Sequence, residues 1–187
     1  MSKTIKSGKE AVRNLFQLFN KKPQDENQKG IKIFPKDFDI SWGDDSRYWI
    51  RHETSEKTAE LKQVCWLQVT GSKRVKTGKS YEIEFNITLK ADAFGWNGLP
   101  LSLMAKIGAK GKSIWKKIKP LEETGREEKF DIPKPEEKFI VKIPKPEDDK
   151  GDEDKDLFFG LYEIWSNKWK GGLLINYATV KEVSSPN

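Results

Sequence analysis

Residues 81–89 constrain the fold of this chain more than any other stretch. Their odd positions are apolar and their even positions are polar. A period of two is typical of a β-strand with one buried side and one side in water. Phe139, Val141 and Ile143 alternate in the same way. At least two strands with a buried face are therefore predicted.

Further strand candidates follow one another along the chain, separated by turns rich in Gly, Pro, Asp and Lys. They are residues 31–35, 37–42, 47–53, 61–70, 100–107, 113–118, 127–132, 157–165 and 172–182. Many short strands with little helix predict an all-β fold, an antiparallel β-sandwich of the jelly-roll kind.

Residues 7–20 form the exception, because their apolar side chains recur with the period of a helix. Ser7 and Glu10 match a capping box, and an apolar stripe follows them. A short N-terminal amphipathic helix is predicted here. It could dock on the sandwich or on a partner subunit, or lie on a membrane surface through its lysines.

The size and composition of the chain fit one domain with a short appendage. It has 187 residues, of which 34% are charged and 11% aromatic, including seven tryptophans, too many for a disordered chain. We expect a helix and linker at residues 1–30, one domain at 31–183 and a tail at 184–187. The net charge of +6 favours loose contact with anionic partners without specifying one.

Catalysis is not expected, since the motifs that carry it are missing. His52 is the only histidine, and no nucleophile elbow, phosphate-binding loop or Cys/His metal cluster is present. We expect no cofactor and no metal. The single cysteine, Cys65, indicates a reducing compartment and is expected to be a buried, inert thiol. Neither a secretory signal nor a membrane-spanning segment is expected.

Two tryptophans flank a polar turn at residues 42–49. Trp42 and Trp49 enclose Asp45 and Arg47, so flat apolar rings stand beside a carboxylate and a guanidinium. A sugar needs this mixture, because its C–H face stacks on an indole while its hydroxyls need donors and acceptors. The alternative is that both tryptophans belong to the core.

A second aromatic stretch lies at residues 161–172. Glu163 continues the alternation of an apolar strand face, so its carboxylate is expected to point inward and either pair with a cation or await a ligand hydroxyl. Arg47 and Arg51 are the expected partners under the first alternative. A turn follows, built from Asn167, Lys168 and Trp169.

Lysines crowd into residues 106–119 around one tryptophan. Lys110, Lys112, Lys116 and Lys117 surround Trp115 in the sequence. Basic groups beside a stacking ring could hold single-stranded RNA, which is the alternative function for this chain. A solvated hairpin whose Trp115 serves the core would explain the same pattern.

Five pieces of the sequence, in this order, resemble the phloem protein two family of plant lectins, which includes the tobacco lectin Nictaba and the cucurbit phloem lectins. The resemblance covers residues 31–183. The pieces are Ile40-Ser41-Trp42, Asp45-Ser46-Arg47-Tyr48-Trp49, residues 61–69, Gly95-Trp96-Asn97-Gly98-Leu99-Pro100 and Trp169-Lys170-Gly171-Gly172-Leu173.

The resemblance implies a lectin that binds oligomers of N-acetylglucosamine, such as chitooligosaccharides and the N-glycan core. It also implies a plant protein of the cytoplasm and phloem sap or the nucleus, often a homodimer, and for cucurbit members an association with RNA. The two binding tryptophans of the family correspond to Trp42 and Trp49, and its binding glutamate to Glu163. A second acidic residue of some members has no clear counterpart.

The resulting hypothesis is a non-catalytic sugar site. One of Trp42 and Trp49 stacks on a pyranose ring and the other shapes the loop. Glu163 accepts hydrogen bonds from the sugar, with Asn167 and Lys168 as donors.

Overall fold

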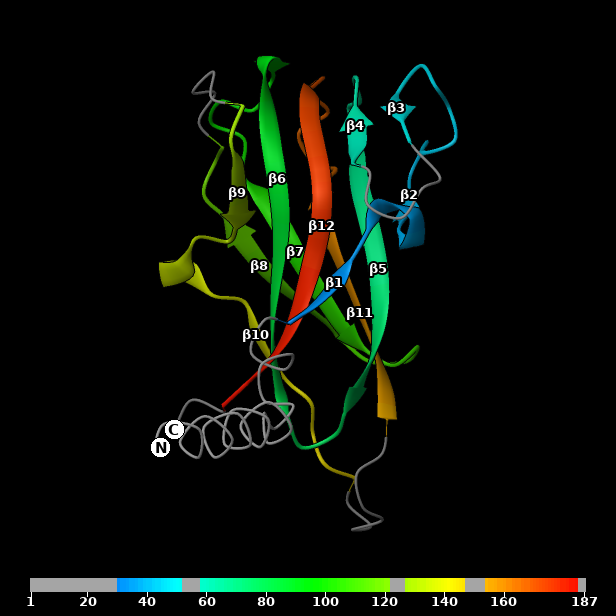
Figure 1. The fold of residues 1–187 in the computed structure, drawn as a ribbon, viewed down its shortest axis with the longest axis vertical. Coiled ribbons are helices and arrows are strands. Elements are labelled where there is room, and N and C mark those ends of the chain that lie inside the picture. Colours follow the sequence, from blue (N-terminus) through cyan, green and yellow to red (C-terminus); the bar gives the residue numbers. More distant parts are fainter. Residues whose placement is uncertain (1–29, 52–57, 122–126, 147–153, 185–187) are drawn as a thin grey trace, which may run out of the picture.

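The computed structural model describes residues 30–51, 58–121, 127–146 and 154–184. These residues form two antiparallel β-sheets that pack face to face, with two short 3₁₀ turns, η1 (Pro35–Asp37) and η2 (Pro135–Glu137) (Figure 1). The predicted antiparallel β-sandwich is confirmed. The predicted helix at residues 7–20 and the linker after it up to residue 29 lie outside the described residues, as does His52, and the division at residues 30 and 184 stays a prediction.

The first sheet has seven strands and is built on two long central ones. Its order is β10 (Ile140–Lys142), β6 (Ser80–Phe94), β12 (Gly171–Val183), β4 (Ala59–Leu61) and β3 (Trp49–Ile50). β1 (Ile31–Ile33) also pairs with β12, and β9 (Lys129–Ile132) also pairs with β6.

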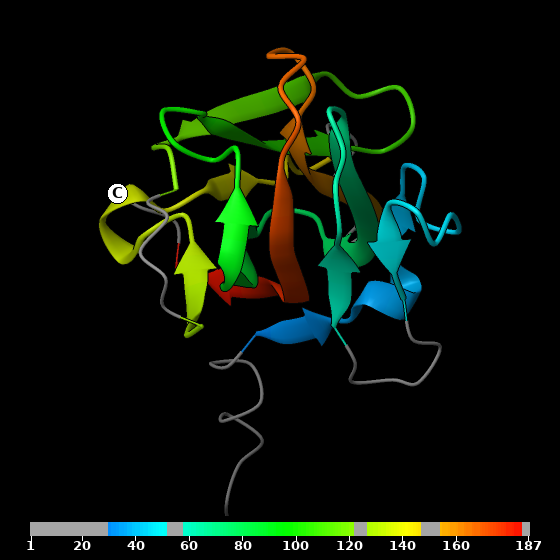
Figure 2. The ribbon, with the colours of Figure 1, turned by 90° about the horizontal axis from the view of Figure 1, so that it is seen from above.

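The second sheet has five strands, with β11 at its centre. Its order is β2 (Asp39–Ile40), β5 (Leu67–Lys76), β11 (Asp154–Glu163), β7 (Leu101–Ile107) and β8 (Ser113–Ile118). The chain crosses between the sheets repeatedly: it passes from β2 in the second sheet to β3 and β4 in the first, and then returns to β5 in the second (Figure 2).

One predicted strand is wrong in an informative way. Residues 61–70 do not form a single strand: β4 ends at Leu61, and β5 begins at Leu67 in the other sheet. Residues 62–66 carry the chain from one sheet to the other. β5 then continues to Lys76 through a polar run that has no strand signature in the sequence.

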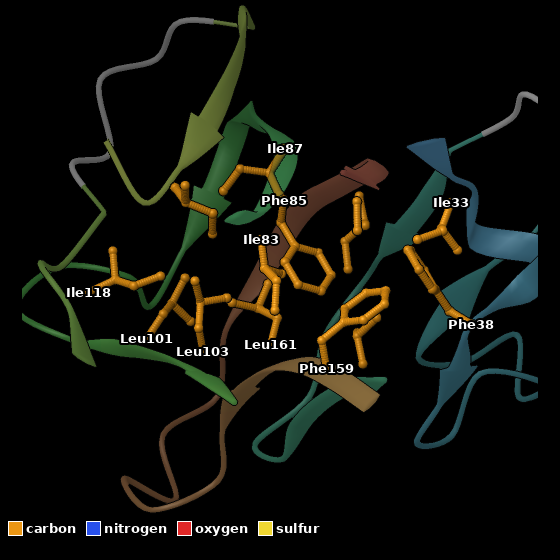
Figure 3. Packing of buried hydrophobic residues seen from close by; sticks show 14 of the residues in the cluster. Ile33, Phe38, Ile83, Phe85, Ile87, Leu101, Leu103, Ile118, Phe159 and Leu161 are labelled. Atoms are coloured by element: carbon orange, nitrogen blue, oxygen red, sulfur yellow. The ribbon is translucent and has the colours of Figure 1, made fainter. Parts of the chain in front are cut away.

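The core lies between the sheets, where the alternation of β6 places Ile83, Phe85 and Ile87 fully buried (Figure 3). The ring of Phe85 meets the ring of Phe159 from β11 at 5.9 Å between centroids. Phe38, just before β2, contacts both, at 6.0 Å and 6.5 Å. This aromatic trio joins the two sheets, and edge-on aromatic pairs of this kind add to the stability gained from burial alone.

Gly71 explains how the trio fits beneath a strand. It lies opposite Phe159 in the pairing of β5 with β11. A Cβ atom at this position would lie 2.8 Å from the Phe159 ring and 3.1 Å from the Phe38 ring. A side chain here would therefore push the rings apart.

Replacing Phe85 with alanine is expected to lower the free energy of unfolding by about 3–5 kcal/mol, since it removes the centre of the trio and leaves a cavity. Urea denaturation followed by tryptophan fluorescence measures this change. Lys142→Ala, on the exposed side of β10, is the control and should change stability by about 0.5 kcal/mol or less. Equal stabilities for the two variants would contradict the role given to the trio.

Candidate functional site

A groove of about 830 Å³ opens on the surface, and aromatic side chains dominate its wall. Its lining comprises Ser41, Trp42, Tyr48, Val64, Cys65, Trp66, Gln68 and Trp169. Trp42, Trp66 and Trp169 keep 60%, 45% and 52% of their surface exposed to solvent. Large aromatic residues exposed together on a protein surface mark a place where a ligand or partner is bound.

The groove forms where three connections cross between the sheets. Residues 41–48 link β2 to β3, residues 62–66 link β4 to β5, and residues 164–170 link β11 to β12. The 62–66 connection forms backbone hydrogen bonds with both of the others. The amide of Lys62 donates to the carbonyl of Tyr48 at 2.8 Å, and the amides and carbonyls of Val64 and Lys170 bond reciprocally at 2.9 Å.

Trp42 is placed on the groove by an unusual backbone conformation. Its φ of +64° lies in the left-handed region, which costs a bulky residue about 1–2 kcal/mol. The turn is closed by the amide of Gly43 donating to the carbonyl of Ile40 at 2.8 Å. Such conformations are retained at functional sites when the surrounding structure enforces them.

Asp45 and Arg47 bind each other and brace the same turn. Arg47 Nη2 donates to Asp45 Oδ2 at 2.6 Å, and the Arg47 amide donates to Asp45 Oδ1 at 3.0 Å. These hydrogen bonds lower the pKa of Asp45 to about 2. The guanidinium also lies 5.4 Å from the ring of Tyr48, whose own ring contacts Trp42 at 5.8 Å. Neither Asp45 nor Arg47 belongs to the lining of the groove.

Trp49 is a core residue, with 2% of its surface exposed. Its indole N–H finds no hydrogen-bond partner among the residues that the structure describes. Of the two tryptophans in the predicted site, Trp42 presents its ring to solvent. Trp49, the first residue of β3, is packed in the core.

A buried ion pair anchors the 164–170 connection. Lys170 is fully buried, and its Nζ lies 2.6 Å from Oε2 of Glu163, which is 2% exposed. The same Nζ donates to the carbonyl of Cys65 at 2.9 Å, which ties the pair to the 62–66 connection. The amide and hydroxyl of Ser166 donate to the two oxygens of Glu163 at 3.0 Å and 2.8 Å.

These partners decide the charge state of Glu163. Burial acts to raise its pKa, but the hydrogen bonds from Lys170 and Ser166 outweigh burial, and the pKa lies below its ordinary value. The expected pairing with Arg47 or Arg51 is wrong. Arg47 holds Asp45, and Arg51 donates to the carbonyls of Pro35 and Phe38 at 3.1 Å and 3.2 Å.

The Gly-Trp-Asn-Gly loop, residues 95–98, packs against the backbone on either side of Lys170. Trp96 is fully buried, and its Nε1 donates to the carbonyl of Gly171 at 2.8 Å. Gly95 has a φ of +82°, and a Cβ atom there would collide with the carbonyl oxygen of Trp169. The first turn after Phe94 can therefore lie directly against the base of the 164–170 connection.

The remaining predicted sugar-binding residues lie beside the groove. Asn167 and Lys168 are exposed on the 164–170 connection but outside the lining of the groove. Cys65, expected to be buried, is partly exposed within the lining. Sequence reasoning missed Trp66 and Gln68, which share a hydrogen bond of 3.2 Å from the indole N–H to Gln68 Oε1.

The four lysines of the RNA alternative do not share one surface. Lys110 and Lys112 lie in the turn between β7, which ends at Ile107, and β8, which begins at Ser113. On β8, Lys116 pairs with Leu103 and Lys117 with Ser102, so their side chains leave opposite faces of the sheet. RNA binding stays a prediction.

Two further observations bear on the chemistry of the described residues. No group of His, Cys, Asp and Glu within them is arranged to hold a metal ion. No helix in the same part of the chain is long and apolar enough to cross a bilayer. What the groove offers is exposed indole faces with an amide and a hydroxyl beside them.

Comparison with known proteins gives consistent matches. A family model described as Phloem protein 2 matches residues 28–181. Protein PHLOEM PROTEIN 2-LIKE A9 of Arabidopsis thaliana is 41% identical over 170 residues, which cover 88% of this chain and 93% of that protein. A lectin of Luffa acutangula is 32% identical over 83 residues, which cover 40% of this chain and 39% of the lectin.

Among solved structures, the CBM22-1 xylan-binding domain from Paenibacillus barcinonensis Xyn10C is similar with a TM-score of 0.43 and 9% identity. The match covers 84% of this chain and 97% of that domain.

Replacing Glu163 with glutamine is expected to lower the free energy of unfolding at neutral pH by about 3–5 kcal/mol, because it leaves the Lys170 ammonium buried without its counter-charge. The pKa of Glu163 is lower in the folded protein than its ordinary value of 4.5. The wild-type pair therefore contributes fully above that value and loses its contribution as the pH falls through the lower folded pKa.

The difference in stability between wild type and Glu163→Gln should consequently narrow as the pH is lowered. Urea denaturation at a series of pH values measures it, with Lys168→Ala, an exposed lysine of the same connection, as the control. A difference below 1 kcal/mol, or one that does not change with pH, would refute the stabilising role of the pair.

Proposed function

Because the chain belongs to the Phloem protein 2 family, we propose that its aromatic groove binds carbohydrate without catalysis, and that the ligands are oligomers of N-acetylglucosamine. One observation carries the proposal: three separate connections each bring an exposed tryptophan, Trp42, Trp66 and Trp169, to one groove. The similarity to the Luffa lectin supports carbohydrate as the class of ligand.

Stacking supplies the first part of the binding energy. The C–H face of a pyranose is apolar, and it displaces water from the faces of Trp42, Trp66 and Trp169. Aromatic contacts of this kind are worth on the order of 1 kcal/mol beyond the burial of area. The rings are held before the ligand arrives, by the left-handed turn at Trp42 and by the hydrogen bond between Trp66 and Gln68, which reduces the entropy lost on binding.

Polar groups of the lining supply selectivity. The indole N–H of Trp66 donates to Gln68 Oε1, so the amide NH₂ of Gln68 is turned toward other acceptors, such as the acetamido carbonyl. The hydroxyl of Ser41 offers both a donor and an acceptor beside it. The acetamido methyl fits the apolar wall near Val64. A sugar that lacks the acetamido group leaves these polar groups without partners, at a cost in affinity.

Glu163 acts in this proposal as a positioning residue. Both of its oxygens already accept hydrogen bonds from Ser166, and Lys170 neutralises its charge. It holds the connection that carries Trp169, and a direct role of Glu163 in binding the sugar stays a prediction. Dimerisation and a location in the cytoplasm, phloem sap or nucleus follow from the family resemblance alone and stay predictions.

Alanine at Trp42, Trp66 or Trp169 is expected to weaken binding of chitotriose about fivefold or more in each case, because each substitution removes one stacking face. Isothermal titration calorimetry measures the affinity. Phe130→Ala is the matched control. It removes an exposed aromatic ring from β9, in the seven-stranded sheet and outside the groove lining, and unchanged affinity is expected. Wild-type affinity in all three tryptophan variants would exclude the groove as the binding site.

A further inference from the structure

A second set of exposed aromatic rings lies outside the groove. Trp115 on β8 and Trp165 on the 164–170 connection keep 47% and 61% of their surface exposed. Their ring centroids are 5.6 Å apart, and the ring of Tyr162 meets Trp115 at 5.1 Å. Both contacts are edge-to-face, which is a preferred geometry for aromatic pairs.

These rings stand on the outer face of the five-stranded sheet. Trp115 lies opposite Met104 in the pairing of β8 with β7, and Tyr162 lies opposite Ser102. The residues that alternate with them, Leu103 and Leu161, are fully buried in the core between the sheets. Figure 2 shows the connection that carries Trp165 reaching past the five-stranded sheet on this outer side. The sequence expectation that Trp115 could serve the core is therefore wrong.

The set is held rigidly. The two edge-to-face contacts fix Trp115 between Tyr162 and Trp165. Tyr162 directly precedes Glu163, and Trp165 follows it by two residues, so the ion pair with Lys170 anchors the backbone of both. A surface whose rings are already ordered loses little entropy when a ligand binds.

The set is also continuous with the groove. Gln68, part of the groove lining, lies directly opposite Tyr162 in the pairing of β5 with β11. Across the sheet the row continues from Tyr162 to Ser102 and Lys117. Three strand spacings separate Gln68 from Lys117, roughly 14 Å. Tyr162 keeps only 8% of its surface exposed and packs against Trp115, so a ligand leaving the groove past Gln68 next meets the exposed ring of Trp115.

We propose that Trp115 and Trp165, with the buried Tyr162 supporting Trp115, form a second saccharide subsite, which extends the groove across the outer face of the five-stranded sheet. This inference depends on the proposed function of the groove. The subsite takes the further units of a neutral oligosaccharide, with the exposed rings of Trp115 and Trp165 as stacking faces and the partly exposed side chain of Gln68 as a hydrogen-bonding group. It makes the protein selective for longer chains.

The charges on this face favour a neutral ligand over nucleic acid. Asp39 on β2 lies opposite Thr70 of β5, on the same face as Tyr162, and is exposed. Burial, and after it the negative charge of Asp39, raises the pKa of Tyr162 above its ordinary value. Lys106 and Lys117 are on this face, but Lys116 is directed to the other. A phosphate backbone would meet both signs of charge here.

The experiment compares chitooligosaccharides from the disaccharide to the hexasaccharide by calorimetry, on the intact chain. Trp115→Ala and Trp165→Ala should weaken hexasaccharide binding about five- to tenfold and leave the disaccharide unchanged. Trp115→Phe keeps a stacking face and should recover most of the loss. Trp42→Ala should weaken every length, and Phe130→Ala none. Thermal unfolding of each variant verifies that it folds.

The outcomes separate the two proposals. Hexasaccharide binding that is unchanged by Trp115→Ala and Trp165→Ala, while Trp42→Ala reduces it, overturns the subsite and leaves the groove. Absence of binding to any carbohydrate on a glycan array overturns both. Retention of single-stranded RNA that falls steeply with salt and is lost in Trp115→Ala, with no dependence on saccharide length, assigns this face to nucleic acid and also overturns the subsite.

Discussion

The arrangement of the groove depends on the buried ion pair between Lys170 and Glu163. A lysine with no exposed surface requires a counter-charge and further acceptors, and Glu163 and the carbonyl of Cys65 provide them. These contacts join the 164–170 connection to the 62–66 connection. Because Trp169 and Trp66 belong to these two segments, one interaction fixes the relative position of two of the three exposed indoles.

The chain uses tryptophan in two ways around the groove. Trp49 and Trp96 are buried and support the segments around the groove, while Trp42 and Trp169 present their faces to solvent. The composition of the segments does not separate the two uses. At residue 42 the separation comes from the left-handed turn, which directs the side chain outward and is braced by the hydrogen bonds between Asp45 and Arg47.

The sandwich could be predicted from sequence because alternation is a local property, and β6 shows it over its central part. The site was less predictable, because its contacts join segments far apart in the chain. The sequence around Lys170 gives no sign of its burial except Glu163, seven residues earlier. Trp66 was assigned to a strand, although the unbroken apolar run from Val64 to Leu67 departs from the period of two. That departure marks the crossing between sheets and could have identified Trp66.

All the aromatic walls of the groove are carried by chain segments that leave one sheet and enter the other. The relative position of these walls therefore depends on how the two sheets pack together, and the aromatic trio beneath Gly71 is part of that packing. Interior packing and the geometry of the groove are thus coupled in this protein. A substitution deep in the sandwich can shift the walls of the groove without touching any residue that lines it.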